Sequence, residues 1–233
     1  MLTIANRLKS ALDTIQDSAS KAGRNPAEIK LLAVSKTKPN QAIREAWQAG
    51  QRMFGENYVQ EGIQKIQELE ALDGIEWHFI GPLQSNKTRV VAEHFDWVQT
   101  IDRAKIAERL NKQRPTNMAP LQVCIQVNIC ADENKSGVTP DEVKPLAKLI
   151  SDMPNINLRG IMTIPANTDS TKEQRQAFNA MQTLFKELQS EYPQVDTLSM
   201  GMSGDMDTAI QSGSTMVRIG TAIFGAREKK TQN

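Results

Sequence analysis

The chain has 233 residues, of which 39% are hydrophobic, and a formal net charge of +1 at pH 7. A nearly neutral chain creates no global field that would attract nucleic acid or an anionic membrane surface, so we expect neither as a partner. No apolar run approaches the roughly 18 residues of a membrane span, and charged residues interrupt the segment where a signal peptide would be apolar. Two cysteines, Cys124 and Cys130, make neither a disulfide framework nor a metal cluster, and we expect a cytoplasmic protein.

Helical and extended patterns alternate along the chain. Apolar residues at helical spacing predict an amphipathic helix over about residues 1–22, followed by a turn at Gly23 and Asn25-Pro26. Strands are predicted at 31–34, 51–56, 76–80, 97–101, 121–129, 157–164, 196–200 and 216–220. Helices are predicted at 40–49, 59–72, 84–94, 103–113, 140–153 and 172–190, with a short helix from 203 or 204 to 213 and a helical or irregular tail after 221.

This alternation predicts βαβ units and therefore a parallel sheet. Eight such units in 233 residues favour a closed (β/α)8 barrel, the TIM barrel, as a single domain over residues 1–233. An open doubly wound sheet is the alternative, because one more or one fewer strand would change the topology.

The fifth predicted strand has two distinct faces. One face carries Val123, Ile125, Val127 and Ile129, and the other carries Cys124, Gln126, Asn128 and Cys130. In a barrel we expect the first face to meet the helices and the second to face the interior. Gln126 and Asn128 then either line a site at the carboxyl end of the strand or hydrogen-bond to each other.

Lys36 stands at the carboxyl end of the first predicted strand, before Pro39 opens a helix. Reduced solvation at the tip of a buried strand and the like charge of Lys38 both disfavour the ammonium form. A neutral amine is what a Schiff base with an aldehyde requires. The alternative is an ordinary solvated lysine in a basic turn.

Other polar residues follow further strands. Asn57 follows the second, Ser203 the seventh, and Gly220 and Thr221 the eighth. The loops after strands seven and eight are a frequent phosphate site in (β/α)8 enzymes. The hydroxyls of Ser203 and Thr221 and the bare backbone of Gly220 suit a phosphate. The alternatives are a helix cap at Ser203 and a turn glycine at Gly220.

Arg218 alternates with Val217 and Ile219 and is therefore expected to point into the barrel. An arginine there requires an acceptor, because burying an unpaired charge is unfavourable. A pyridine nitrogen or a phosphate would serve, and an internal ion pair with Glu56 is the alternative.

The remaining motifs indicate no further chemistry. The segment 220–225 has the spacing of a P-loop but lacks its Lys-Ser/Thr. His78 and His94 are not spaced as metal ligands, and we expect both to be structural. The segment 133–137 either holds an anion or is a solvated loop, and the charged run at 61–70 is expected to form an exposed helix face.

Five blocks of the sequence closely resemble the pyridoxal phosphate homeostasis protein family (YggS-like, PROSC), and the resemblance covers essentially the whole chain. The blocks are Leu-Ala-Val-Ser-Lys-Thr-Lys-Pro (32–39), Phe-Gly-Glu-Asn-Tyr-Val-Gln-Glu (54–61), Trp-His-Phe-Ile-Gly-Pro-Leu-Gln-Ser-Asn-Lys (77–87), Leu-Ser-Met-Gly-Met-Ser (198–203) and Val-Arg-Ile-Gly-Thr-Ala-Ile-Phe-Gly (217–225). The barrel of that family is similar to the N-terminal domain of alanine racemase.

The resemblance implies a cofactor, pyridoxal 5′-phosphate (PLP), held as a Schiff base on Lys36. It implies a phosphate cup of Ser203, Gly220 and Thr221, with Arg218 reaching the ring nitrogen or the phosphate and Asn57 nearby. It also implies a role in balancing the intracellular vitamin B6 pool. A positive Arg218 against the ring nitrogen would weaken the electron sink of the cofactor, which suits holding it more than carbanion chemistry.

Three functions are compared on this basis. The first is a PLP carrier or regulator without turnover, with PLP-dependent apo-enzymes as candidate partners, and the second is an amino-acid racemase. A two-base racemase needs an acid or base opposite the lysine, which alanine racemase takes from a second domain of the partner subunit. We expect that domain to be absent here, which leaves only Tyr58 and Tyr192 and favours a monomeric carrier. The third function is a protein-interaction module that binds no cofactor.

Overall fold

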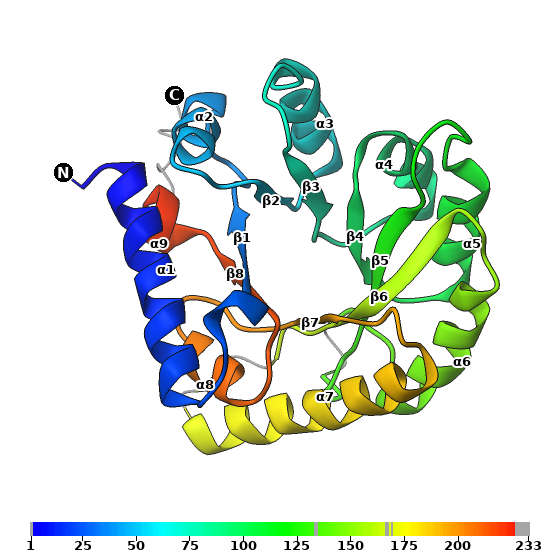
Figure 1. The fold of residues 1–233 in the computed structure, drawn as a ribbon. Helices are drawn as coiled ribbons and strands as arrows, with labels where there is room; N and C mark the ends of the chain where they lie inside the picture. The colour runs from blue at the N-terminus through cyan, green and yellow to red at the C-terminus, as the bar shows by residue number, and fades with distance from the viewer. Residues whose placement is uncertain (1, 133–134, 166–167, 169, 227–233) are drawn as a thin grey trace.

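A closed barrel of parallel strands forms the centre of the computed structural model, which describes residues 2–132, 135–165, 168 and 170–226, and helices surround it (Figure 1). The strands are β1 (Lys30–Val34), β2 (Met53–Glu56), β3 (Glu76–Phe79), β4 (Trp97–Ile101), β5 (Leu121–Gln126), β6 (Ile156–Met162), β7 (Thr197–Ser199) and β8 (Met216–Ile219). The barrel closes because β1 pairs with β8, from Lys30 opposite Met216 to Ala33 opposite Ile219. The predicted TIM barrel is therefore confirmed, and the open sheet is excluded.

The helices follow the predicted order with shifts at some ends. They are α1 (Ile4–Lys21), α2 (Asn40–Gln48), α3 (Val59–Glu68), α4 (Thr88–His94), α5 (Ala104–Gln113), α6 (Pro140–Ser151), α7 (Thr171–Glu191), α8 (Met206–Gln211) and α9 (Thr221–Phe224), with 3₁₀ turns η1 (Pro26–Glu28) and η2 (Ser85–Lys87). At α6 the Thr139 side chain and the Glu142 side chain form a capping box, as Thr-Pro-Asp-Glu predicts. The first turn of the helix predicted at 84–94 is instead the separate turn η2.

The strands present their two faces to different surroundings. Leu31 and Ala33 pack in the main core with the helices. Leu32 belongs to a separate small cluster with Ile80 and Met216, which occupies part of the barrel interior. Because successive side chains of a strand alternate in direction, this assigns the inward positions of β1 and β8.

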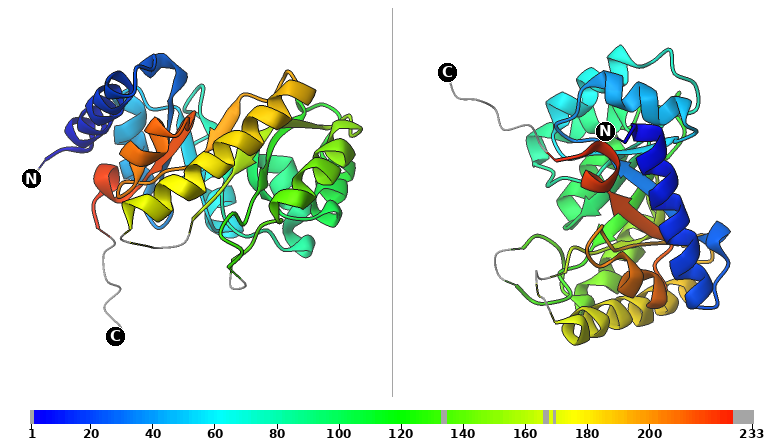
Figure 2. Two further views of the ribbon diagram at one scale, coloured as in Figure 1. Left: turned by 90° about the horizontal axis from the view of Figure 1, so that it is seen from below. Right: turned by 90° about the vertical axis from the view of Figure 1, so that its left-hand side faces the viewer.

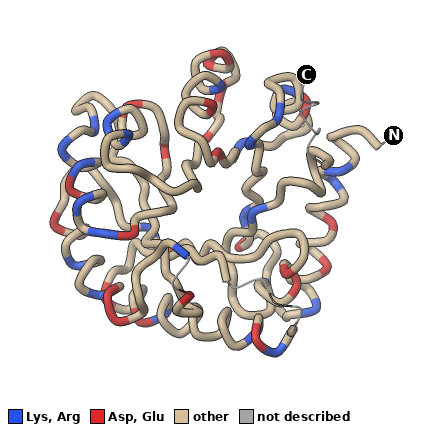
Figure 3. Tube along the Cα trace, turned by 180° about the vertical axis from the view of Figure 1, so that it is seen from behind, with Lys and Arg blue, Asp and Glu red and all other residues tan. Residues whose placement is uncertain are grey.

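Outside the barrel, α1 lies against α8 and α9 (Figures 1 and 2). It buries Leu8, Ala11 and Ile15, as its amphipathic pattern predicts. Lysine and arginine are interspersed with aspartate and glutamate over the outer helices (Figure 3). Within the described residues, none of the helices combines the length and the hydropathy needed to cross a membrane.

Candidate functional site at the mouth of the barrel

The predicted site residues lie in or directly after strands that are neighbours in the barrel. They are Lys36 after β1, Asn57 after β2, Ser203 after β7, Arg218 within β8, and Gly220 and Thr221 after β8. The carboxyl ends of parallel strands meet at one edge, the mouth of the barrel. Because β2, β1, β8 and β7 are consecutive around the barrel, the segments that carry these residues are neighbours, although the side chains of Ser203 and Asn57 line separate hollows.

The turn after β1 lies against the turn after β8. A Cβ atom at Gly220 would be 3.2 Å from the carbonyl oxygen of Val34, so glycine permits this close approach of two backbones. Val34 packs with the interior cluster, whereas Ser35 faces outward to Glu56. Lys36 is half-buried and stands in the turn that follows β1, where Lys38 N donates to Ser35 O.

The turn that follows Lys36 is held by two contacts from outside it. Thr37 adopts a φ of 61°, which is uncommon for a β-branched residue, and its N–H donates to Glu61 Oε1 at 2.5 Å. The Lys38 ammonium donates to the carbonyl oxygens of Gly225 and Ala226 at 2.9 and 2.8 Å. Lys38 is therefore directed toward the end of α9.

A buried charged cluster supports this turn from the helix side of the wall. Lys65 of α3 is 5% exposed and donates to Ser35 O at 2.8 Å, Glu56 Oε1 at 2.9 Å and Glu61 Oε1 at 2.6 Å. Ser35 Oγ also donates to Glu56 Oε1, at 2.6 Å. Burial raises the pKa of Glu56, and the Lys65 ammonium opposes this shift.

This cluster corrects two sequence-based interpretations. Glu56 pairs with Lys65 and not with Arg218, because its Cβ faces α3 near Gly62. The charged run at 61–70 is not wholly exposed, since Lys65 is buried. The spacing of Glu61 and Lys65, one helical turn apart, was the available signal for their pairing, but only the fold shows that Glu56 lies opposite them.

Arg218 is buried inside the barrel, as the alternation in β8 predicts, with 4% of its surface exposed. Its Nη1 donates to Ser199 Oγ and its Nη2 to Thr163 O, both at 2.8 Å. Burial lowers the pKa of Arg218 to about 10, against the opposing charge of Asp205, so the group stays charged at neutral pH. Two neutral acceptors use two of the five N–H groups of a guanidinium, which can therefore bind a further acceptor.

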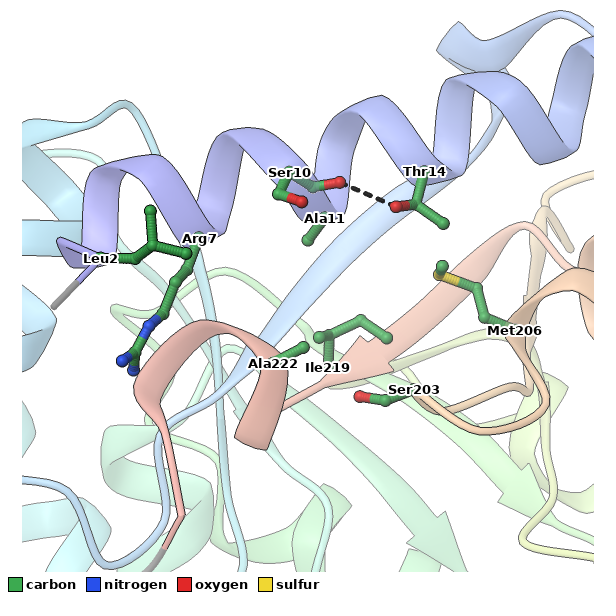
Figure 4. Close-up of a pocket in the computed structure, with 9 residues that line it drawn as sticks. All are labelled: Leu2, Arg7, Ser10, Ala11, Thr14, Ser203, Met206, Ile219 and Ala222. Carbon is green, nitrogen blue, oxygen red and sulfur yellow. Dashed lines mark hydrogen bonds between the residues drawn. The ribbon is translucent and has the colours of Figure 1, made fainter.

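Ser203 lies apart from the inner side of the mouth. It is exposed in the turn before α8 and lines a groove of about 340 Å³ between α1, β8 and α9, together with Arg7, Ile219 and Ala222 (Figure 4). The helix start predicted at 203 or 204 is wrong, because α8 begins at Met206. Ser203 is thus not the helix cap, and its place in a phosphate cup stays a prediction.

Asn57 lines a second hollow, of about 240 Å³, over the strands β2 to β6. Its other lining residues are Ile80, Pro82, Thr100, Gln126, Lys135, Ser136 and Ile164. Within the described residues Asn57 Oδ1 is buried without a hydrogen-bond partner. A Cβ atom at Gly81 would lie 2.0 Å from Asn57 O, so glycine at 81 is required for this turn.

The prediction for the fifth strand is correct only for its first part. Cys124 is buried in the interior with Trp97 and Met162. The strand ends at Gln126, so Asn128 and Cys130 lie beyond it. Gln126 and Asn128 donate to Ser136 O and Asp132 O and not to each other. Of the segment predicted as an anion site or solvated loop, residues 133–134 lie outside the described residues, and Lys135 Nζ donates to Pro165 O at 2.6 Å.

Periodicity and spacing did not identify several residues that contact the predicted ones. Ser199 and Gln99 inside the barrel and Glu61 and Lys65 outside it belong to this group. Alternation along β7 and β4 places Ser199 and Gln99 inward, but their partners come from distant strands. Within the described residues, no group of three or more His, Cys, Asp or Glu side chains is arranged to hold a metal ion.

Comparison with known proteins gives one consistent result. The family described as the alanine racemase N-terminal domain matches residues 8–228. The pyridoxal phosphate homeostasis protein of Haemophilus influenzae is 59% identical, covering 99% of this chain and 98% of its own length. That of Escherichia coli (strain K12) is 55% identical, covering 98% of both chains.

Solved structures agree with these relatives. PipY of Synechococcus elongatus, in a structure with PLP bound, is 38% identical with a TM-score of 0.81 and covers 96% of this chain and 100% of its own. Alanine racemase from Corynebacterium glutamicum is 17% identical with a TM-score of 0.69, and the match covers 97% of this chain but 63% of the racemase. At that identity the racemase shows a shared fold alone.

Proposed function

Because the chain belongs to the pyridoxal phosphate homeostasis protein family, within the wider family of the alanine racemase N-terminal domain, we propose that it binds PLP and acts in intracellular PLP homeostasis as a carrier or regulator without turnover. The observation that supports this proposal is that the half-buried Lys36 follows β1 and the buried Arg218 lies within β8, the strand that pairs with β1 and closes the barrel. A relative of the same family has been solved with PLP bound.

The residues present suit the groups of this cofactor. Arg218 carries a buried positive charge bonded only to neutral acceptors among the described residues, so it can donate to a ring nitrogen or a phosphate oxygen. Gly220 leaves the backbone at the start of α9 without a side chain above it, and the adjacent Thr221 hydroxyl is exposed. Ser203 would complete the phosphate contacts only if its turn presents the hydroxyl to the mouth.

Lys36 is the proposed covalent attachment point. When bound, the cofactor supplies an aldehyde carbon with which the Lys36 amine condenses to a Schiff base, releasing one water molecule. Lys38 is the nearest competitor in sequence, but its ammonium is directed to the carbonyl oxygens of Gly225 and Ala226. Lys38 therefore serves as the matched control position for Lys36.

The positions of the two tyrosines favour a carrier over a racemase. Tyr192 follows α7 and precedes β7, at the end of the barrel opposite the mouth. Tyr58 is at the mouth side but 53% exposed, so it is poorly held for proton transfer at a fixed distance. We also propose a cytoplasmic, monomeric, single-domain protein that exchanges PLP with PLP-dependent apo-enzymes.

Absorbance spectra with and without borohydride test this proposal. The purified protein incubated with PLP is expected to show a visible absorbance band that the protein alone lacks, because a Schiff base forms, and borohydride should fix the cofactor to the chain. Lys36→Ala should abolish the trapped adduct, and the matched variant Lys38→Ala should retain it. Peptide mapping of the reduced protein identifies the modified lysine.

Two results would contradict the proposal. An absence of absorbance and of adduct in the wild-type protein would support the interaction module instead. Substantial racemisation of amino acids that is abolished by Lys36→Ala would support the enzyme. An undiminished adduct in Lys36→Ala would move the attachment point to another lysine, with Lys38 the first to test.

A further inference from the structure

A continuous row of polar side chains crosses the barrel interior behind Arg218. Arg218 of β8 donates to Ser199 Oγ of β7 at 2.8 Å, and Ser199 Oγ donates to Gln99 Oε1 of β4 at 2.6 Å. Gln99 Nε2 lies 2.9 Å from His78 Nδ1 of β3, and His78 Nε2 lies 2.8 Å from Glu76 Oε1. The first four residues are buried, and the Glu76 side chain is 39% exposed at the start of β3.

The Arg218 guanidinium at one end of the row determines which group donates and which accepts in each hydrogen bond. A guanidinium can only donate, so Ser199 Oγ accepts from Arg218 and must pass its own proton to Gln99 Oε1. Gln99 Nε2 then donates to His78 Nδ1, and its second N–H points to Met216 Sδ at 3.2 Å. His78 is left with its proton on Nε2, which donates to Glu76.

The opposite orientation of the Gln99 amide would break this order. The Gln99 oxygen would then require a proton on His78 Nδ1, and the unprotonated Nε2 would face the Glu76 carboxylate. Only a doubly protonated His78 ring would avoid that repulsion. Burial disfavours this charged ring, because it lowers the pKa of His78 against the opposing effect of Glu76. Burial alone would raise the pKa of Glu76, but the hydrogen bond from His78 is the largest of the effects that together lower it below its usual value.

The row therefore joins a cation at one end to an anion at the other through neutral groups whose dipoles are all aligned. We infer that Gln99, backed by His78 and Glu76, is a positioning residue for Arg218, because it fixes the Ser199 hydroxyl as an acceptor and so holds the guanidinium toward a ligand at the mouth. This inference rests on the proposed function, since the ligand concerned is PLP.

The packing around the row is consistent with side chains that are held in fixed positions. The His78 ring stacks on Trp97, with centroids 5.0 Å apart and an interplanar angle of 13°. Gln99 and His78 are fully buried, and their hydrogen-bonding groups have no access to water. Loss of one member leaves its neighbours unpaired in a low-dielectric interior, so the arrangement acts as a unit.

Binding of PLP to matched variants tests the inference. Gln99→Leu keeps the approximate volume and removes both hydrogen-bonding ends, and Ser199→Ala removes only a hydroxyl. Each is expected to weaken PLP binding about tenfold, the size of one lost buried hydrogen bond, and to shift the absorbance maximum of the bound cofactor. Met162→Leu, a buried interior change without a hydrogen bond, should leave both properties unchanged.

The double variant distinguishes one connected row from two separate effects. If Ser199 and Gln99 act together, Ser199→Ala/Gln99→Leu loses about as much affinity as either single variant, because additivity fails within one network. Multiplied losses, or single variants with wild-type affinity and spectrum, would overturn the inference. Should Gln99→Leu fail to fold, Gln99→Met replaces it as the variant without hydrogen-bonding ends, because Ser199→Ala alone removes the direct acceptor of Arg218 and does not test Gln99.

Borohydride separates this result from failure of the proposed function. Wild type and variants are all expected to give the Lys36 adduct at saturating PLP, since Lys36 is not part of the row. If the wild-type protein forms no adduct, the proposed function fails. If the adduct forms but affinity and spectrum do not respond to Gln99, only the positioning role fails.

Discussion

Replacing Lys65 by methionine should destabilise the protein much more than the same replacement of an exposed lysine. Lys65 is 5% exposed and donates three hydrogen bonds, to Ser35 O, Glu56 Oε1 and Glu61 Oε1. Glu56 is fully buried. Without Lys65, the remaining donor to its carboxylate among the described residues is the Ser35 hydroxyl.

The magnitude follows from the burial of both partners. Removing one member of a buried ion pair costs about 3–5 kcal/mol, because the other charge is left uncompensated. Methionine fills most of the volume of the lysine stem, so a cavity adds little. The contact with Glu61, whose side chain is 27% exposed, adds a smaller amount, since exposed pairs contribute roughly 0–1 kcal/mol.

The loss should depend on pH in a defined direction. Burial already raises the pKa of Glu56, against the effect of Lys65, and the variant lacks that opposing charge. A group whose pKa is raised on folding contributes stability at low pH and loses it as the pH rises through the folded-state pKa. The difference between Lys65→Met and wild type should therefore be smaller at pH 5 than at pH 8.

Urea unfolding followed by tryptophan fluorescence measures this difference. The control is Lys148→Met, an exposed helical lysine, expected to lie within about 0.5 kcal/mol of wild type. Adding Glu56→Gln to Lys65→Met should recover part of the loss, because the uncompensated charge is removed. A loss below about 1 kcal/mol, or one that does not change between pH 5 and pH 8, would refute the reasoning.

Two further predictions concern groups away from the site. Burial raises the pKa of the Cys124 thiol, whereas Cys130 is exposed. A chromogenic thiol reagent should therefore modify Cys130 in the native protein and Cys124 only after denaturation. Rapid modification of Cys124 in the native protein would contradict its burial. A Cβ atom at Gly160 would lie 1.7 Å from Thr197 O between β6 and β7, so Gly160→Ala should cost about 3 kcal/mol in urea unfolding. Gly204→Ala, where no atom lies within 4 Å of the new Cβ, is the matched control, and equal stability of the two variants would show that β7 moves freely.

The barrel and the inward direction of Arg218 were predictable because they depend on local periodicity. Alternation of period two along β1 and β8 assigns the inward residues, and the βα order assigns the shared mouth. The residues flanking Arg218 are apolar and pack outward, as expected of Val217 and Ile219. The local sequence pattern therefore predicts the direction of a side chain when that direction depends only on alternation within its own strand.

The sequence-based predictions were wrong where contacts with distant segments determine the end of an element or the burial of a side chain. The alternating pattern of the fifth strand continues to Cys130, but the strand ends at Gln126, opposite the end of β6 at Met162. At α8 both Ser203 and Asp205 are residue types that begin helices, and the structure starts the helix after Asp205, whose carboxylate accepts from Met202 N. The burial of Lys65 similarly depends on what β1 and β2 place opposite α3.

Lys36 and Arg218 are held by buried neighbours, and in this they differ from the residues predicted to contact the phosphate. Lys36 follows Ser35, which the Lys65 cluster holds from outside the wall, and Arg218 is held from inside through Ser199. Ser203 and Thr221, by contrast, are exposed. Exposed polar contacts contribute little free energy because water competes for the same groups. In the proposed carrier, Lys36 and Arg218 would therefore belong to a part of the site that buried contacts hold in place, whereas Ser203 and Thr221 would not.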